Sequence, residues 1–175
     1  MATTWPPPDA VRIRPIEAGD DPELARFYAR LSEDSRRLRF FAVTRGLSPA
    51  QSAGFCAPDH GHREGFVATL ADGPSDVTRI VGHVCLEPAG AGRAEVAIAV
   101  ADELQRAGIG RRLMAAALVW ARRAGVDTLT ATMLASNPGI HRLLASLGLP
   151  ARITAAGADT STIEITVPAV PARAA

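Results

Sequence analysis

The chain has 175 residues, a length typical of one globular domain and short for two. Hydrophobic residues make up 47% and charged residues 21%, which excludes wholesale disorder, and the net charge of +1 gives no global attraction to nucleic acid or membranes. The longest strongly apolar run, Leu113 to Ala121, is far shorter than the roughly 20 residues of a bilayer span, and no signal-peptide pattern opens the chain. We therefore expect a cytoplasmic protein.

All nineteen Lys and Arg positions are arginine, so the chain has no lysine side-chain amine. Its two cysteines, Cys56 and Cys85, fit no metal-ligand spacing and are too few for a disulfide framework. The segment from Cys56 to His62 also contains an aspartate and two histidines, but their spacing matches no closed zinc site. We expect reduced, packed thiols, no metal, and a loop near the substrate entrance at this segment.

Alternating patterns predict one domain at residues 10–167 between a proline-rich tail at 1–9 and a loose tail at 168–175. The first half predicts, in order, a strand at 11–16, a helix capped by Asp20 or Asp21 that runs to Leu31, a helix from Ser32 to the doublet Phe40-Phe41, a helix beginning at Ser48-Pro49, and strands at 65–70 and 79–86 joined by a turn at 72–75.

The second half contains the strongest helix pattern, residues 108–124, with Gly125 as its C-terminal stop. The other predicted elements are a strand at 95–100, a strand at 128–134, a helix at 138–147 ended by Gly148, and an antiparallel pair at 152–156 and 162–167. This order predicts the α/β (α+β) class, with a mixed sheet flanked by helices.

The strand at 95–100 leads through a short loop to two glycines, Gly108 and Gly110, that open the long helix. Backbone N–H groups at such a turn can approach an anion, and the helix macrodipole favours negative charge there. Arg106, Arg111 and Arg112 add cationic side chains around the same point. This combination favours a pyrophosphate group as the ligand.

Three interpretations of this turn compete with an ordinary glycine-bearing turn. The dinucleotide-binding fingerprint fails, because Leu113 stands where a third glycine or alanine is required. A Walker loop fails, because it needs a lysine and the chain has none. The third pattern, Gln/Arg-x-x-Gly-x-Gly/Ala, matches Gln105 to Gly110 in full.

With this motif between an apolar strand and the long helix, and a following strand that leads to Asn137, the chain resembles the GCN5-related N-acetyltransferase (GNAT) superfamily. The resemblance covers about Val11 to Val167. It implies a mixed, mostly antiparallel central sheet in which the strand before the loop splays from its neighbour. It also implies acetyl-CoA as the co-substrate.

The resemblance further implies which residues would hold acetyl-CoA. Backbone groups of Ile98, Ala99 and Val100 would pair with the pantetheine arm, and Asn137 would supply a polar contact to it. The diphosphate would lie at the loop that Gln105 opens, held by the backbone N–H groups of Arg106, Ala107, Gly108, Ile109, Gly110 and Arg111.

Acyl transfer to an amine needs a base for the amine proton, and Glu95 is the candidate. Strand alternation places it on one face with Ala97 and Ala99, whose small side chains leave room for a substrate. A half-buried carboxylate there would have a raised pKa and would accept the proton directly or through water. The alternatives are a glutamate on a solvated strand face and one paired with Arg93.

A narrower resemblance rests on Leu31 to Phe41 together with Ala94 to Ala97 on the central strand. These segments are similar to the acetyltransferase domain of bacterial Pat-type protein lysine acetyltransferases. That resemblance implies a protein lysine as the acceptor and a glutamate general base at the position of Glu95. Pat-type proteins often carry a regulatory module, and we expect none in a chain of this length.

Many GNAT members place a tyrosine seven residues after the asparagine, as the acid for the departing thiolate, and here that position is Leu144. Pat-type domains also tend to lack this tyrosine. Water can protonate the thiolate, because a thiol is a tolerable leaving group. His141 is a further candidate acid, with a surface position on its helix as the alternative.

Two other groups of side chains invite a functional interpretation. His83 and Cys85 share a strand face and could approach the cleft, but packed core positions are favoured. Arg36, Arg37 and Arg39 are interpreted as a solvated helix face, with recognition of an acidic protein surface or RNA as the alternative.

The leading hypothesis is an acetyl-CoA-dependent N-acetyltransferase that transfers acetyl directly to a primary amine, with a protein lysine as the favoured acceptor. Acetylation of a small amine is the alternative within catalysis, and a non-catalytic acyl-CoA-binding regulator is the alternative outside it. Neither a membrane nor nucleic acid is expected as a partner. Ala97 and Ala99 leave the length of the acyl group open between acetyl and propionyl.

Overall fold

The computed structural model describes residues 10–71 and 78–168. The predicted tail at 1–9, the turn at 72–75 and the C-terminal tail from residue 169 lie outside the described residues. The strands are β1 (Val11–Pro15), β2 (Glu64–Ala71), β3 (Thr78–Pro88), β4 (Arg93–Val100), β5 (Thr128–Leu134), β6 (Ala151–Ala156) and β7 (Thr160–Thr166). The helices are α1 (Asp21–Arg30), α2 (Glu33–Phe40), α3 (Pro49–Phe55), α4 (Ile109–Arg123) and α5 (Pro138–Leu147), with 3-10 turns η2 (Ala18–Asp20) and η3 (Asp102–Leu104).

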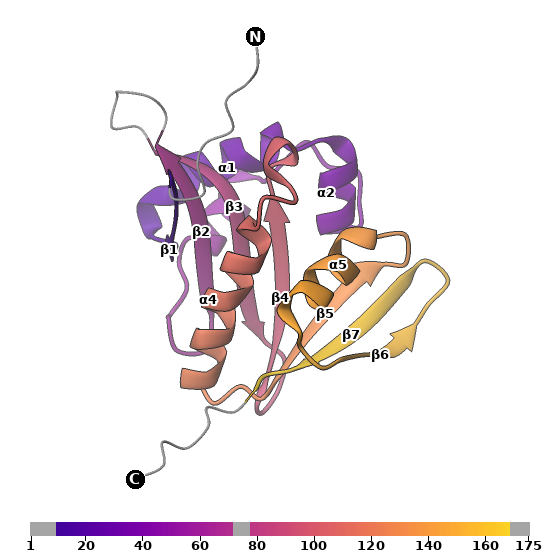
Figure 1. Ribbon diagram of the computed structural model, residues 1–175. Helices are drawn as coiled ribbons and strands as arrows, with labels where there is room; N and C mark the ends of the chain where they lie inside the picture. The colour runs from indigo at the N-terminus through magenta and orange to yellow at the C-terminus, as the bar shows by residue number, and fades with distance from the viewer. Residues whose placement is uncertain (1–9, 72–77, 169–175) are drawn as a thin grey trace.

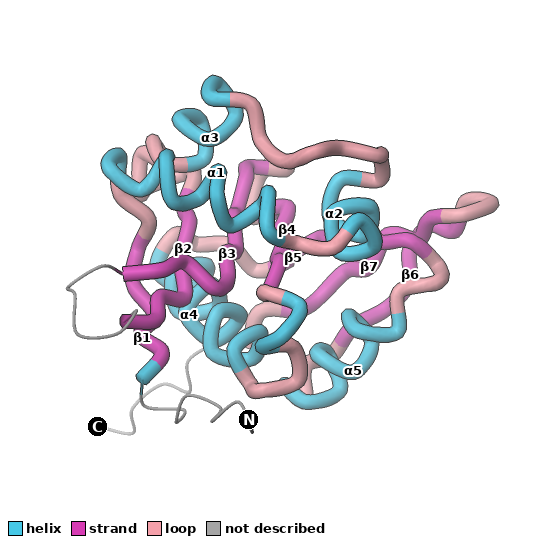
Figure 2. The backbone as a smooth tube through the Cα atoms, turned by 90° about the horizontal axis from the view of Figure 1, so that it is seen from above, coloured by secondary structure: helices cyan, strands magenta, loops and turns pink. Residues whose placement is uncertain are grey.

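These strands form one sheet in the order β1-β2-β3-β4-β5-β7-β6, and every neighbouring pair is antiparallel except β4 with β5. Helices α1, α2 and α3 lie on one face of the sheet, and α4 and α5 lie on the other (Figure 2). The predicted α/β class and the mixed, mostly antiparallel sheet are therefore confirmed. No helix in the described part of the chain is long and apolar enough to cross a membrane.

Local chemistry explains where the helices begin. The Ser32 hydroxyl accepts a hydrogen bond from Ser35 N and caps α2, and Ser48 caps α3 in a capping box with Gln51. Helix α4 follows Gly108, whose φ of +82° is accessible to glycine at little cost. Its inner face buries Leu113 and Ala117 completely against the sheet, which fixes the start of α4 beside the end of β4.

The two central strands diverge soon after they meet. Arg93–Glu95 of β4 pairs with Thr128–Thr130 of β5, and this parallel pairing stops at Glu95. Beyond that point β4 pairs with β3 as far as Val100, while β5 pairs with β7 as far as Leu134 (Figure 1). The splay expected from the GNAT resemblance is therefore present, and beyond Glu95 it leaves one edge of β4 without a strand partner among residues 10–71 and 78–168.

Candidate active site

A cleft of about 630 Å³, open to solvent, lies where β4 and β5 diverge. Its walls come mainly from β4, β5, α2 and α5, and Met114 of α4 and Ile165 of β7 complete the lining. The side chains that matter most for the chemistry are Glu95, Ile98, Asn137, Leu144 and Arg39. The divergence of the central strands is therefore what creates the site.

Glu95 is the last β4 residue that pairs with β5, and its side chain lines the cleft. It is exposed, and it makes no hydrogen bond or ion pair with any described residue. The expected partner Arg93 instead pairs with Glu164 on β7, so that alternative is wrong. The expectation of a half-buried carboxylate is also wrong, because the divergence of β5 leaves this position open to solvent.

The neighbouring carboxylate on the same sheet face is already engaged. Glu87 lies opposite Glu95 in the β3–β4 register, and its Oε2 lies 2.6 Å from Arg63 Nε. Glu95 is thus the carboxylate of this pair that remains available to accept a proton from a substrate.

The loop between β4 and α4 presents a run of unpaired backbone donors. Among the described residues, no acceptor receives a hydrogen bond from the N–H groups of residues 106–111. Arg106 has a φ of +66° and Gly108 one of +82°, and a left-handed conformation at a non-glycine residue is costly and common at functional sites. Unsatisfied donors at a helix N-terminus form an anion-binding arrangement, which suits a diphosphate.

Helix α2 braces this loop from the side of the cleft. The Asp102 carboxylate accepts hydrogen bonds from Ser32 N at 2.8 Å, Ser32 Oγ at 2.7 Å and Ser35 Oγ at 2.6 Å. Burial alone would raise the pKa of Asp102, but the hydrogen bonds from Ser35 and Ser32 outweigh it and hold the pKa below its usual value. Gln105 Nε2 donates to Ser35 Oγ at 3.2 Å and to the Val100 carbonyl at 3.4 Å.

Gln105, a residue of the predicted cofactor loop, takes part in this brace. Its side chain joins α2 to the end of β4 and does not line the cleft. Sequence reasoning missed Asp102 and Ser35, whose spacing to each other carries no local signal. The available hint was the helix cap at Ser32, which places both serines on the first turn of α2.

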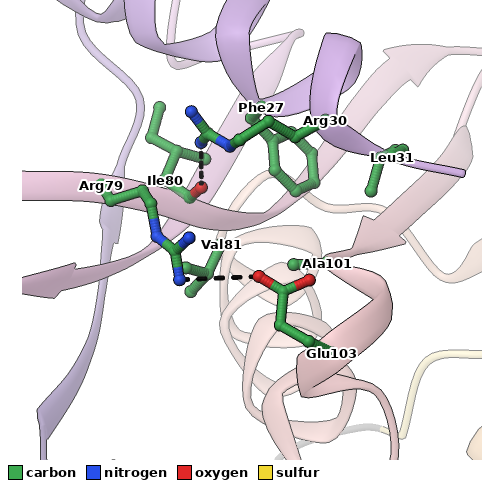
Figure 3. A pocket seen from close by; sticks show the side chains of 8 residues that line it. All are labelled: Phe27, Arg30, Leu31, Arg79, Ile80, Val81, Ala101 and Glu103. Carbon is green, nitrogen blue, oxygen red and sulfur yellow. Dashed lines mark hydrogen bonds and ion pairs between the residues drawn. The ribbon is translucent and has the colours of Figure 1, made fainter.

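Contacts at a second hollow also hold the β4–α4 loop. A smaller hollow of about 210 Å³ lies between α1, β3 and η3, and Figure 3 shows the side chains that line it. There Arg79 Nη2 lies 3.5 Å from Glu103 Oε1, and Arg30 Nη2 donates to the Ile80 carbonyl at 3.3 Å. Arg112, expected near the anion, donates to the Val11 carbonyl at 2.7 Å and so joins α4 to β1.

Asn137 serves two purposes at the other wall. Its Oδ1 accepts hydrogen bonds from Gly139 N at 3.0 Å and Ile140 N at 3.4 Å, which caps α5. Its amide nitrogen donates to no described residue, and the side chain lines the cleft. Asn137 can therefore cap the helix and still offer a donor to a ligand.

Two of the three expected pantetheine contacts lie outside the cleft lining. Ile98 lines the cleft, whereas Ala99 and Val100 do not. They lie opposite His83 and Gly82 of β3, and their other strand edge faces the gap left by β5. Their backbone groups on that edge are free of strand partners among the described residues, as pairing with a pantetheine arm would require.

The positions that could supply an acid to protonate the departing thiolate differ in their access to the cleft. Leu144 is buried and lines the cleft at the position of the missing tyrosine. His141 is exposed on α5 and does not line the cleft, so its candidacy is not supported. Within the described cleft lining, no tyrosine or histidine takes the place of that acid.

His83 and Cys85 are core residues, as favoured. His83 is completely buried, its Nδ1 lies 3.0 Å from the Tyr28 hydroxyl, and burial lowers its pKa to about 3. Cys85 is buried, its Sγ lies 3.2 Å from Arg39 Nη2, and burial raises the pKa of its thiol. Neither residue lines the cleft.

The arginine cluster on α2 is not a solvated face. Arg36 donates to the carbonyls of Thr44, at 2.6 Å, and Leu31. The Arg39 guanidinium turns inward, 4.9 Å from the centre of the Phe40 ring. Only Arg37 of the three is exposed, and the interpretation of this segment is corrected because residues 36 and 39 share the inner side of the helix.

The segment from Cys56 to His62 packs as an ordinary loop. The Asp59 carboxylate accepts hydrogen bonds from the backbone of Gly61, His62 and Arg63, which lower its pKa to about 2. Trp120 of α4 donates to the His60 carbonyl at 3.2 Å. No residue of this loop lines the cleft, so the expected position at the substrate entrance is not supported. Residues 10–71 and 78–168 contain no cluster of three side chains able to hold a metal ion.

Comparison with known proteins agrees with this geometry. The model of the acetyltransferase (GNAT) family matches residues 21–149. The GNAT domain of Pat from S. lividans superposes with a TM-score of 0.79 at 26% identity, covering 89% of this chain and 90% of that one. The ribosomal-protein-S18-alanine N-acetyltransferase of Escherichia coli shares the fold, with a TM-score of 0.63 at 19% identity over 94% of this chain and 99% of that one.

A cAMP-binding acyltransferase from Mycobacterium smegmatis also shares the fold, with a TM-score of 0.56 at 24% identity. The match covers 90% of this chain but 44% of that protein. The similarity therefore concerns the portion of that protein that has this fold.

Proposed function

Because the chain belongs to the acetyltransferase (GNAT) family and is thus an acetyl-CoA-dependent N-acetyltransferase, we propose that its acceptor is a lysine side chain of another protein and that Glu95 is the general base. One observation carries the proposal for Glu95. Its carboxylate is unpaired among the described residues and lines the cleft where β4 and β5 part, on the strand that leads to the unsatisfied donors of the β4–α4 loop.

The residues present suit acetyl-CoA. We propose that the N–H groups of residues 106–111 bind its diphosphate, since they form a run of unpaired donors at a helix N-terminus. The open edge of β4 at Ile98, Ala99 and Val100 would pair with the amides of the pantetheine arm, and the Asn137 amide nitrogen would donate to the same arm. Acetyl-CoA then supplies the activated acyl group as a thioester.

Glu95 has the accessibility that a base for this reaction requires. It would take a proton from the incoming ammonium directly or through water, which its exposure permits. The amine nitrogen would then bond to the thioester carbonyl carbon, and the carbon–sulfur bond would break. The departing thiolate would take its proton from solvent, because Leu144 replaces the acid at that wall.

The proposal of a protein lysine rests on the Pat-like segment from Leu31 to Phe41. This segment contains α2, and its residues Leu38, Arg39 and Phe41 line the same cleft as Glu95. The chain contains no lysine, so acetylation of its own side-chain amines cannot obscure the acceptor assay.

Two measurements test the proposal in order. Acetyl-CoA at about 100 times its dissociation constant adds about 2.7 kcal/mol of stability, which raises Tm by roughly 5–10 °C, whereas NADPH leaves it unchanged. Lysine-containing proteins and small amines are then compared as acceptors by mass spectrometry. Turnover confined to small amines would exclude the lysine proposal, and binding without turnover on any acceptor would favour a regulator.

A further inference from the structure

Arg39 is a largely buried cation on the α2 wall of the cleft. Its Nη2 lies 3.2 Å from Cys85 Sγ, and its guanidinium carbon lies 4.9 Å from the Phe40 ring centre and 5.7 Å from the Phe55 ring centre. The Tyr28 hydroxyl is a further polar neighbour of the guanidinium, whereas the Arg39 Nε is buried without a partner. The side chain therefore lines the active-site cleft as a cation with one N–H donor still unused.

Three half-buried arginines elsewhere in the described chain pair with carboxylates. Arg14 pairs with Asp20 at 2.6 Å, Arg63 with Glu87 at 2.6 Å, and Arg93 with Glu164. Arg39, more deeply buried than these, makes no ion pair with a described carboxylate. Aromatic faces offset part of the cost of burying a cation, but an anion is the partner that offsets most of it.

The sheet register places this cation close to the reacting group. Cys85, which Arg39 contacts, lies opposite Ala97 in the β3–β4 pairing. Ala97 is two residues from Glu95, so the two side chains share a strand face. Arg39, Ala97 and Glu95 all line the cleft. An anion that Arg39 bound would therefore belong to a substrate held at the site of transfer.

We propose that Arg39 binds a carboxylate carried by one of the two substrates. The carboxylate belongs either to the far end of a dicarboxylic acyl group, such as succinyl on CoA, or to an acidic group beside the amine of the acceptor. Guanidinium and carboxylate match in geometry, and their hydrogen bonds are strengthened by charge. The inference rests on the proposed transferase activity and specifies its substrates.

The bonds exchanged stay the same for a dicarboxylic donor. The amine nitrogen bonds to the thioester carbonyl carbon, the carbon–sulfur bond breaks, Glu95 takes the amine proton and the thiolate is protonated by water. The terminal carboxylate takes no part in these steps and stays bound to Arg39. Recognition of the acyl group is thus separate from the chemistry.

The donor arm of the test measures binding of succinyl-CoA and butyryl-CoA, which carry acyl chains of equal carbon number, by calorimetry. We expect wild type to bind succinyl-CoA at least as tightly as butyryl-CoA, and Arg39→Gln to reduce the ratio of the two affinities about tenfold. Arg39→Lys keeps the charge and should retain part of the preference. Arg37→Gln, an exposed change on the same helix, should leave the ratio at the wild-type value.

The acceptor arm uses acetyl-CoA with two lysine peptides that differ in a glutamate or glutamine beside the lysine. If the carboxylate comes from the acceptor, kcat/KM favours the glutamate peptide about tenfold, and Arg39→Gln removes that preference. A preference in either arm that depends on Arg39 supports the inference and identifies the source of the carboxylate.

Two results would overturn the inference. In the first, wild type binds butyryl-CoA more tightly than succinyl-CoA and also prefers the glutamine peptide. This comparison uses wild type alone, so it remains valid even if Arg39→Gln fails to fold. Alternatively, Arg39→Gln could weaken both members of each pair equally, which would make Arg39 a structural residue. If no acceptor is turned over, the proposed function fails, and the binding ratio of the donor arm alone decides on Arg39.

Discussion

The Glu95 carboxylate is free to accept a proton because the charged residues near it in the sheet form ion pairs with other residues. Arg93 pairs with Glu164, which also binds Arg152 at 2.7 Å, and Glu87 pairs with Arg63. The two arginines Arg93 and Arg63 are therefore already engaged with other carboxylates. A single carboxylate is left facing the cleft, and a proton acceptor there can act on a bound ammonium.

Glu95→Gln should lower kcat by about 10²- to 10⁴-fold, the range typical for loss of a general base. The KM for acetyl-CoA should change little, because the diphosphate loop is untouched. The rate of the variant should recover partly at high pH, where the free amine forms without help. Steady-state kinetics between pH 6 and 10 measure this.

Glu87→Gln is the matched control for that experiment, since Glu87 lies opposite Glu95 in the sheet but is paired with Arg63. It should retain most of the activity. Equal rates for wild type and Glu95→Gln across the whole pH range would refute the general-base role.

Gly108 and Gly110 offer a contrast within one motif. Gly108 has a φ of +82°, and an alanine in that conformation costs about 1–2 kcal/mol. Gly110 lacks a positive φ, and an added Cβ would meet Leu143 Cδ1 at an ordinary 3.5 Å. Gly108→Ala should therefore lower Tm by several degrees and weaken acetyl-CoA binding, whereas Gly110→Ala should keep a Tm close to wild type. Equal losses of Tm in the two variants would show that backbone conformation is not the cause.

At the scale of elements, the two halves of the active site are joined through α2. Its first turn holds the β4–α4 loop, the proposed diphosphate site, through Asp102, and its last turn places Arg39 in the cleft wall. The β4–α4 loop and the α2 wall of the cleft are therefore linked through one helix. A substitution at Asp102 should change the binding of acetyl-CoA, even though Asp102 does not line the cleft.

Asp102→Ala removes the acceptor of three hydrogen bonds and should raise the KM for acetyl-CoA several-fold with a smaller effect on kcat. Because the native pKa of Asp102 lies below its unfolded value, its contribution to stability is complete above about pH 4 and is lost as pH falls through the native pKa. Kinetics at pH 7.5 thus report the intact brace. Glu33→Ala, exposed in the same helical turn, is the control, and an equal rise of KM in both variants would contradict the role of the brace.

For the whole molecule, the completely buried His83 links stability to pH. Its pKa is about 3 in the native state and about 6.5 in the unfolded chain, so between these values the unfolded state binds the extra proton. Stability from this residue is complete above about pH 6.5 and falls by up to about 1.4 kcal/mol per pH unit as pH decreases toward the native pKa.

Urea unfolding of wild type and His83→Gln at pH 7.0, 5.5 and 4.5 measures this slope. The variant keeps a neutral polar group beside Tyr28 but cannot titrate, so its free energy of unfolding should fall less steeply with decreasing pH. Parallel curves for the two proteins would mean that His83 does not link stability to pH, whatever the difference in their absolute stability.

The sequence by itself predicted the order of strands and helices along the chain, the glycine-bearing turn before the long helix and the place of Glu95 on the central strand. These rest on local signals: hydrophobic period, the serine caps of α2 and α3, and two glycines at fixed spacing before a long helix. Such signals lie within a few residues of one another. They predict the structure correctly because the elements observed in the fold match these local preferences.

Only the tertiary structure decided which charges meet. Arg93 reaches Glu164 across 71 positions of the chain, and Arg112 reaches Val11 across 101. Arg39 looked like part of a solvated run, yet α2 turns it toward Cys85, 46 positions away. The partner of a long flexible side chain is set by the register of strands and the docking of helices, and no local pattern encodes either. That is why the exposure of Glu95 and the place of Arg39 in the cleft wall appear only in the folded molecule.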